Sequence, residues 1–108
     1  MLMKQYEVRL ANRDPITGSE SAKSRPVVIV SLDPLNERLQ TVTVCPLTSQ
    51  LHPTWRTRLP VRIAKRHAEI ACDQIRTISK SRLGDLLGVL SDADASALRR
   101  LLTEMYGE

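Results

Sequence analysis

Aromatic side chains are scarce in this chain of 108 residues. They make up 3% of the sequence, and phenylalanine is absent. Domains that hold single-stranded nucleic acid mainly by stacking, such as RRM and cold-shock domains, expose several rings. Tyr6, Trp55 and Tyr106 are too few and too far apart in the sequence for a platform of that kind. Any contact with RNA is therefore expected to be mainly electrostatic and hydrogen-bonded.

Clustered metal ligands and paired cysteines are also absent from the sequence. Cys45 and Cys72 form no C-x-x-C motif, and neither His52 nor His67 stands at metal-ligand spacing from a second ligand. This pattern predicts two buried free thiols, no metal site and no cofactor. Free buried thiols are typical of proteins from a reducing compartment.

The sequence contains no signal-peptide core and no apolar run near the ~18 residues of a membrane-spanning helix. We therefore expect a cytoplasmic protein that makes no membrane contact. A chain of 108 residues is long enough for one domain, spanning 1–108, with a single modest core. Its formal net charge of +4 weakly favours a polyanionic partner.

Short strands dominate the pattern of the chain before its last part. Arg25 and Pro26 precede Val27–Val30, a β-branched run typical of a strand that is buried on both faces. Pro46 predicts the end of another strand, and Pro60 predicts an edge strand. The expected strands are 6–11, 25–31, 41–45, 58–63, 69–72, 73–78 and 83–90.

Polar segments separate these strands. Residues 12–24 are rich in turn-forming and hydroxyl residues, which predicts a long loop. A loop of this length in a compact domain is usually either disordered or functional. Asp33-Pro34 and Asn36 predict a turn before the third strand.

The last part of the chain has the pattern of an amphipathic helix. Ser91 is placed to cap its N-terminus, and Asp94 follows three residues later. Gly107 is predicted to end the helix in a left-handed conformation. The predicted apolar face consists of Ala95, Leu98, Leu101, Leu102 and Met105. The sequence therefore predicts a mainly β fold, in which a C-terminal helix packs on a small barrel-like sheet.

Five segments between residues 12 and 91 carry recognisable motifs. They are Asn12-Arg13-Asp14-Pro15 with Gly18-Ser19-Glu20, Lys23-Ser24-Arg25-Pro26-Val27-Val28, Val44-Cys45-Pro46-Leu47-Thr48-Ser49-Gln50, Asp73-Gln74-Ile75-Arg76-Thr77-Ile78, and Ser81-Arg82-Leu83 with Gly88-Val89-Leu90-Ser91. In this order and spacing they resemble the MazF/PemK (Kid) toxins of bacterial type II toxin–antitoxin systems. The terminal helix agrees with the resemblance.

The resemblance implies an SH3-like small barrel, the fold of CcdB, MazF and PemK toxins, and a homodimer. It implies a sequence-specific, metal-independent endoribonuclease that cleaves single-stranded RNA, including mRNA, and so inhibits translation and growth. No cofactor is implied. The implied partner is a cognate antitoxin, whose disordered acidic C-terminal segment fills the RNA groove.

By motif, the resemblance makes Arg25 (K-x-R-P), Thr48 (P-x-T-S) and Glu20 (the acid after Gly-Ser) the catalytic candidates. Attack by the RNA's own 2′-hydroxyl needs a base, positive charge on the phosphate and an acid for the leaving 5′ oxygen. Arg25 offers a planar charged fork, Thr48 a neutral hydroxyl, and Glu20 a base. The RNA-binding candidates are Ser19, Lys23, Ser49, Gln50, Asp73, Gln74 and Arg82.

The sequence departs from the family pattern at two places. The family usually has Arg-Gly-Asp or Arg-Gly-Glu before its first strand, where this chain has Gln5-Tyr6-Glu7. Kid-like members carry an arginine two residues before the Asp of the D-Q pair, and this chain has Ala71 there. Arg25 is therefore the main candidate for the catalytic cation.

Other interpretations remain open from the sequence. Thr48 could be a turn residue, Glu20 a solvated loop charge and Asp73 a turn cap. The domain could be a non-catalytic RNA- or protein-binding module with the same fold, or a gyrase poison like CcdB, although the CcdB pattern lacks the K-x-R-P and P-x-T-S segments.

Arginines 25, 56, 58 and 82 are expected to contribute to the basic groove that binds RNA or an acidic antitoxin segment.

Overall fold

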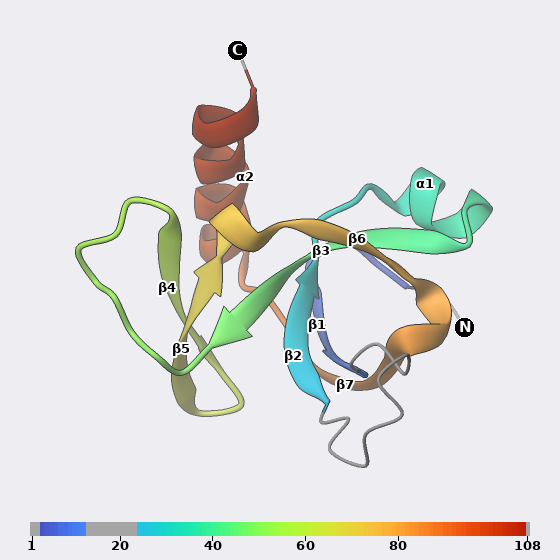
Figure 1. Ribbon diagram of the computed structural model, residues 1–108, viewed down its shortest axis with the longest axis horizontal. Helices are drawn as coiled ribbons and strands as arrows, with labels where there is room; N and C mark the ends of the chain where they lie inside the picture. Colours follow the sequence, from blue (N-terminus) through green and yellow to red (C-terminus); the bar gives the residue numbers. More distant parts are fainter. Residues whose placement is uncertain (1–2, 13–23, 108) are drawn as a thin grey trace.

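The computed structural model describes residues 3–12 and 24–107, and its seven strands form one antiparallel sheet that curls into a half-barrel (Figure 1). The strands are β1 (Glu7–Ala11), β2 (Arg25–Ile29), β3 (Thr41–Thr48), β4 (Arg58–Ile63), β5 (Arg66–Ala71), β6 (Arg76–Ser79) and β7 (Leu83–Val89). The helices are α1 (Asp33–Arg38) and α2 (Asp92–Tyr106), with short 3₁₀ turns η2 (Cys72–Gln74) and η3 (Lys80–Arg82). The prediction of a mainly β, SH3-like small barrel with a C-terminal helix is confirmed.

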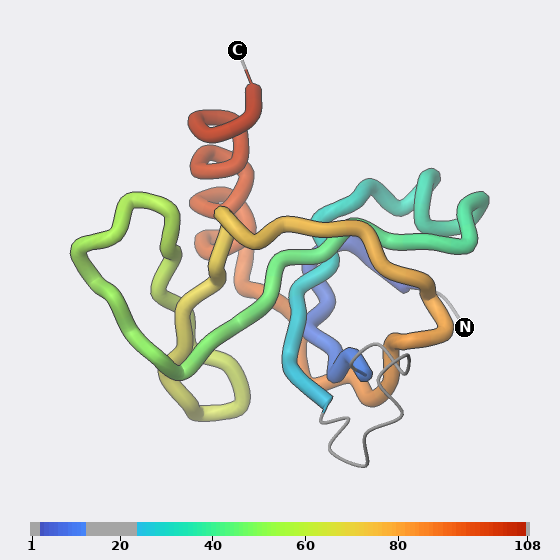
Figure 2. The backbone as a smooth tube through the Cα atoms, viewed as in Figure 1, coloured from blue at the N-terminus to red at the C-terminus, as the bar shows by residue number. Residues whose placement is uncertain are grey.

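Strand β3 links the two parts of the sheet, and Figure 2 shows it passing from the β1–β2 side to the β4–β5 hairpin. One edge of β3 pairs with β2, while the other pairs first with β6 and then with β5. The order β4-β5-β3-β2-β1-β7 leaves β4 at one end, as Pro60 predicted.

The prediction that Pro46 ends its strand is wrong, because β3 continues to Thr48. The Thr43 carbonyl accepts a hydrogen bond from the Val30 N–H at 2.9 Å, so odd-numbered residues of β3 direct their backbone groups toward β2. Pro46 therefore directs its nitrogen toward the opposite edge. There it falls between the last residue paired with β6 and the first paired with β5, where a missing N–H breaks no ladder bond.

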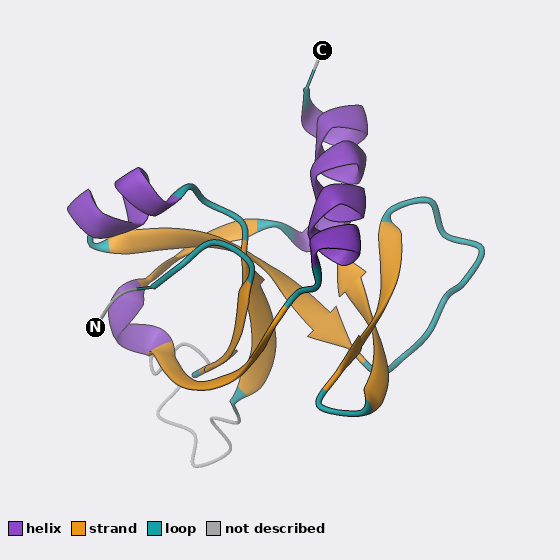
Figure 3. Ribbon diagram, turned by 180° about the vertical axis from the view of Figure 1, so that it is seen from behind, coloured by secondary structure: helices purple, strands orange, loops and turns teal. Residues whose placement is uncertain are grey.

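Two apolar clusters lie on opposite faces of the sheet. Val28 belongs to the first, which α2 covers through Leu98, whereas Val27 and Ile29 belong to the second, between β1, β2, β3 and β6. The β-branched run is thus buried on both faces, as predicted, and each such side chain contributes about 1.5–3 kcal/mol to folding. Figure 3 shows α2 standing beside the β4–β5 hairpin and α1 at the other end of the sheet.

The helices differ from the sequence predictions at two points. Asp33–Arg38 forms α1 instead of a turn, with Pro34 in its first turn, where a proline fits a helix as well as it fits a loop. At α2 the Ser91 side chain accepts a hydrogen bond from the Asp94 N–H at 3.1 Å, which confirms the predicted cap. Gly107 has a φ of −85°, so the predicted left-handed ending is wrong. In the described part of the chain, no helix has both the length and the apolar character that crossing a membrane requires.

Tyr6 takes the place of the glycine in the family pattern and has a backbone φ of 72°, in the left-handed region that favours glycine. Its N–H donates to the Ile29 carbonyl at 2.7 Å, and its carbonyl accepts from the Leu90 N–H at 3.0 Å. Its hydroxyl accepts a hydrogen bond from the Arg99 guanidinium of α2 at 3.0 Å. These contacts hold a conformation that costs a non-glycine residue about 1–2 kcal/mol.

Candidate nucleic-acid site

Arg25 and Thr48 share one face of the sheet, at the end where β2 begins and β3 stops. Val27 pairs with Pro46 in the antiparallel ladder. Arg25 lies two residues before Val27, and Thr48 lies two residues after Pro46. Because side chains alternate between the faces with a period of two, all four belong to the same face. Arg25 is exposed and Thr48 is half-buried. The register of β2 and β3 therefore brings together the two catalytic candidates that the structure describes.

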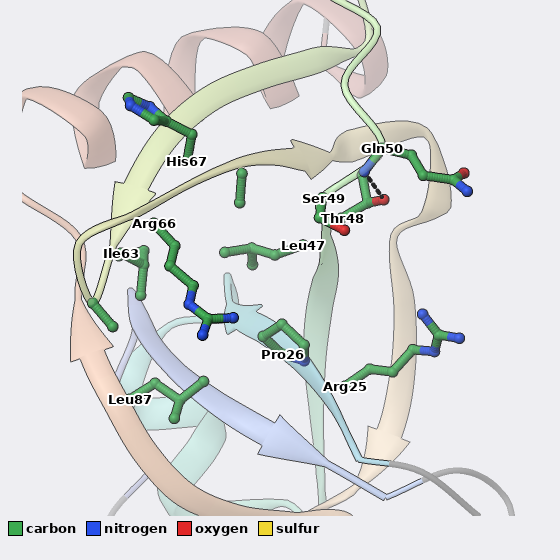
Figure 4. A pocket seen from close by; sticks show the side chains of 12 residues that line it. Arg25, Pro26, Leu47, Thr48, Ser49, Gln50, Ile63, Arg66, His67 and Leu87 are labelled. Carbon is green, nitrogen blue, oxygen red and sulfur yellow. Dashed lines mark hydrogen bonds between the residues drawn. The ribbon is translucent and has the colours of Figure 1, made fainter. Parts of the chain in front are cut away.

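A cavity of about 650 Å³ borders this pair (Figure 4). Its lining includes apolar side chains from β2, β4 and β7, among them Pro26, Ile63 and Leu87. In Figure 4 the Arg66 side chain extends toward Pro26, whereas the Arg25 side chain points away from it. The cavity is thus a mainly apolar hollow into which Arg66 extends, and the Arg25 side chain points away from it.

Thr48, Ser49 and Gln50 also line the cavity. The Thr48 hydroxyl oxygen accepts a hydrogen bond from the Gln50 N–H at 3.1 Å, drawn as a dashed line in Figure 4. This contact supports a turn role for Thr48. A hydroxyl can still donate its own hydrogen while it accepts, so the same side chain remains able to bind a phosphate oxygen.

Asp73 and Gln74 lie in η2, which follows the far end of β5. Arg66, which lines the cavity, is the first residue of that strand, so the strand separates the D-Q pair from the cavity. The structure thus divides the predicted RNA contacts into two groups, one around Thr48 and one around Asp73.

Arg58 occupies the second group and is not part of an exposed basic groove, contrary to the expectation from the sequence. Its side chain is 7% exposed, with Nε 3.5 Å from Asp73 Oδ1 and Nη1 3.7 Å from the buried Glu69 Oε1. Neither nitrogen has a hydrogen-bond partner. Arg58 pairs with Ala71 in the β4–β5 register, so a cation from β4 lies across from the position where Kid-like members have their arginine.

Arg82 is bound to Asn12, the residue that follows β1. Its Nε donates to the Asn12 carbonyl at 2.8 Å, and the Asn12 N–H donates to the Arg82 carbonyl at 2.8 Å. The Ser24 hydroxyl donates to the Asn12 side-chain oxygen at 2.8 Å. Ser19, Glu20 and Lys23 lie outside the described residues, so their roles, like that of Arg82 toward RNA, stay predictions.

Sequence reasoning missed the β4–β5 hairpin as a source of site residues. Ala64 and Lys65 have φ values of 51° and 64°, the pattern of a two-residue hairpin turn, which usually carries Asn-Gly. Without those residues the turn had no sequence signature, and Arg66 and His67 were not assigned to a strand. The polar run Lys65–His67 beside an edge strand was the available signal.

Cys45 and Cys72 are free and buried, as predicted. A hydrogen bond with Cys72 and burial in the core raise the pKa of the Cys45 thiol, which therefore stays protonated at neutral pH. Among the described residues, no three His, Cys, Asp or Glu side chains lie together in a way that could hold a metal ion.

Residues 4–106 match a family described as PemK-like, MazF-like toxin of type II toxin-antitoxin system. The chain belongs to this family. Two curated relatives agree with the assignment to the PemK/MazF family. The chain is 35% identical over 99 residues to Endoribonuclease MazF of Staphylococcus saprophyticus, which covers 84% of this chain and 80% of that protein. It is 34% identical over 100 residues to Endoribonuclease EndoA of Bacillus subtilis, with 85% and 84% covered.

Solved structures give the same PemK/MazF assignment at the level of the fold. Mycobacterium tuberculosis toxin MazF-mt6 superimposes with a TM-score of 0.76 at 25% identity, over 93% of this chain and 95% of that one. MazE-MazF (Form-III) from Deinococcus radiodurans superimposes with a TM-score of 0.82 at 17% identity, over 99% and 98% of the two chains.

Proposed function

We propose that this PemK/MazF family member is a toxin endoribonuclease that cleaves single-stranded RNA through the RNA's own 2′-hydroxyl. The observation that carries the proposal is the placement of Arg25 and Thr48 on one sheet face beside the cavity. The relatives named Endoribonuclease MazF and Endoribonuclease EndoA support the same activity. The family match also favours this reading over a gyrase poison.

In the proposed reaction the 2′ oxygen attacks the adjacent phosphorus, and the bond from phosphorus to the 5′ oxygen breaks. A base takes the proton of the 2′-hydroxyl, and an acid protonates the leaving 5′ oxygen. The products are a 2′,3′-cyclic phosphate and a free 5′-hydroxyl. Arg25 stabilises the charge that develops on the phosphate oxygens, Thr48 holds one of them, and Glu20 is the proposed base.

The proposed partners are a second copy of the chain and a cognate antitoxin. One solved relative from a Mycobacterial species is an endoribonuclease in complex with its cognate antitoxin. The sequence offers two apolar regions that suggest a dimer, Val27–Val30 and the terminal helix, but Val27–Ile29 provide no free surface because they are core residues. Leu86 and Val89 of β7 give a better motive, since they are 49% and 59% exposed. We place the protein in the cytoplasm and treat it as one toxin domain.

The proposal is tested by incubating the purified protein with single-stranded RNA in EDTA and analysing the ends of the products. We expect cleavage without divalent metal and the two end groups named above. RNA with 2′-O-methyl groups should bind and stay intact, because the nucleophile is blocked. Cleavage that depends on a divalent metal, or that leaves a 5′-phosphate, would contradict the mechanism, and binding without any cleavage would identify a binding-only module.

A further inference from the structure

The segment between β3 and β4 carries a stacked pair of rings that the mechanism does not use. The Trp55 indole and the His52 imidazole lie with their centroids 3.8 Å apart and their planes 7° from parallel. Trp55 is 47% exposed, and His52 is half-buried. A flat aromatic pair at the surface is a ready platform for a third flat group.

Buried charges hold this pair in place. The Arg58 guanidinium carbon lies 4.7 Å from the centre of the Trp55 ring, and Glu69 accepts a hydrogen bond from the His52 backbone N–H at 2.8 Å. The Trp55 backbone N–H donates to the His52 backbone carbonyl at 2.9 Å. These contacts fix the backbone of the 52–55 turn and place a cation against the Trp55 ring, so a ligand that stacks on the pair pays less ordering entropy.

The pair also lies next to the proposed reaction site. Gln50, which lines the cavity, is only two residues before His52, and this limits their Cα separation to about 7 Å. Thr48 pairs with Glu69 in the β3–β5 ladder, and Glu69 binds the His52 backbone. An RNA strand that passes Thr48 and Gln50 therefore reaches the two rings next.

The charges around the rings favour a neutral flat group over an acidic peptide. The Arg58 cation already faces two carboxylates, Glu69 at 3.7 Å and Asp73 at 3.5 Å, and Asp73 is partly exposed. An acidic segment would meet an arginine whose charge is already balanced by Glu69 and Asp73, and it would be repelled by the exposed part of the Asp73 carboxylate. A nucleobase carries no formal charge, and every base has a face that stacks on an aromatic ring.

We propose that Trp55 and His52 form a stacking subsite for one unpaired base of the RNA, beside the phosphate site at Arg25 and Thr48. The inference rests on the proposed function for the identity of the ligand. It revises the expectation from composition: Phe, Trp and Tyr rings are too few for a stacking surface, yet one of them, Trp55, is assembled with the His52 imidazole into one subsite. Arg58, Glu69 and Asp73 support the subsite without contacting the base.

The experiment uses the emission of Trp55, which is the only tryptophan in the sequence. The probe is a single-stranded RNA with 2′-O-methyl groups at every position, so that it binds without being cut. We expect saturable quenching of Trp55 as the RNA is added. Trp55→Leu should weaken RNA binding about tenfold, within the range for loss of one base–aromatic stack, and Trp55→Phe should retain most of it. With cleavable RNA, Trp55→Leu should raise KM about tenfold and change kcat much less.

Leu51→Ala is the matched control, since Leu51 is 50% exposed in the same segment and should leave RNA binding unchanged. A series of RNAs with a single abasic position sharpens the test: at one register the loss of the base should remove the difference between wild type and Trp55→Leu. Thermal unfolding checks each variant. If Trp55→Leu does not fold, quenching of the wild type by intact and abasic RNA decides.

RNA that binds, by fluorescence anisotropy, without changing Trp55 emission would overturn the subsite. So would a folded Trp55→Leu that binds RNA like wild type, including the case in which that variant loses affinity only for an acidic antitoxin peptide. Wild type that is quenched by RNA but cuts none would overturn the proposed cleavage and keep the subsite. Wild type that neither binds nor cuts RNA would overturn both.

Discussion

Arg25 and Arg58 each begin a strand that has a proline within its next two residues, yet they have opposite surroundings. Arg25 is exposed beside the cavity, with its side chain pointing away from Pro26 and the hollow (Figure 4). The Arg58 side chain is 7% exposed and faces two carboxylates. The difference shows that the role open to an arginine depends on whether carboxylates of the same protein already balance its charge. Arg25 is available to phosphate, whereas Arg58 stabilises the protein's own anions.

The largest expected effect is on catalysis by Arg25. Arg25→Ala should lower the cleavage rate by roughly 10²–10³, the loss typical of removing one electrostatic stabiliser of the transition state. Arg25→Lys should restore only part of it, because a point charge does not reproduce the planar fork. Single-turnover cleavage measures the rate, and circular dichroism verifies the fold. A folded Arg25→Ala that cuts at the wild-type rate would remove Arg25 from the mechanism.

The second effect is on stability at Arg58. Arg58→Met should lower the free energy of unfolding by about 3 kcal/mol, because it leaves the buried Glu69 carboxylate uncompensated. Arg62→Met is the matched control on the same side of β4, and since Arg62 is exposed its loss should change stability by less than about 0.5 kcal/mol. Urea unfolding measures both. Equal losses in the two variants would mean that Arg58 acts only through net charge.

A smaller effect is expected at Thr48. Thr48→Ala should slow cleavage about tenfold, the equivalent of one neutral hydrogen bond to the phosphate. Thr48→Ser keeps the hydroxyl and should stay close to wild type. If Thr48 were only a turn residue, both variants would cut RNA normally and differ from wild type in stability alone.

The smallest effect concerns Arg66, a third strand-initial arginine, which is exposed and extends into the cavity. If it contacts one phosphate, Arg66→Gln should reduce the slope of log affinity against log salt by ~0.7. Binding of uncleavable RNA at several salt concentrations measures the slope. An unchanged slope would restrict Arg66 to the apolar hollow and exclude it from the RNA path.

Local patterns predicted most of the fold. The β-branched run at Val27–Ile29 required burial on both faces, and the structure provides it. Ser91 and the apolar spacing after it were sufficient to define α2. The turn predicted from Asp33-Pro34 was wrong because the same residues suit a turn and the start of a helix. The strand end predicted at Pro46 was wrong because the effect of a proline depends on which strands pair on each side of β3. Those strands are distant in the sequence.

The candidate site was predictable where motifs are contiguous and not where pairing creates it. Thr48 and Arg25 came from motifs, and the strand register joins them. The burial of Arg58 depends on Glu69 and Asp73, which belong to other elements, so no local pattern contained it. The stack of His52 on Trp55 depends on the same buried group. The composition gives the number of aromatic residues but not their positions in the fold.

The bond between Tyr6 and Arg99 has a consequence for the order in which the fold is completed. It joins residues 93 positions apart, and β1 also pairs with β7 late in the chain. Contacts of such long sequence separation form slowly and late. β1 can pair with β2 early, but its other edge and the Tyr6 hydroxyl lack their partners until β7 and α2 are present. The fold is therefore complete only once β7 and α2 have joined β1.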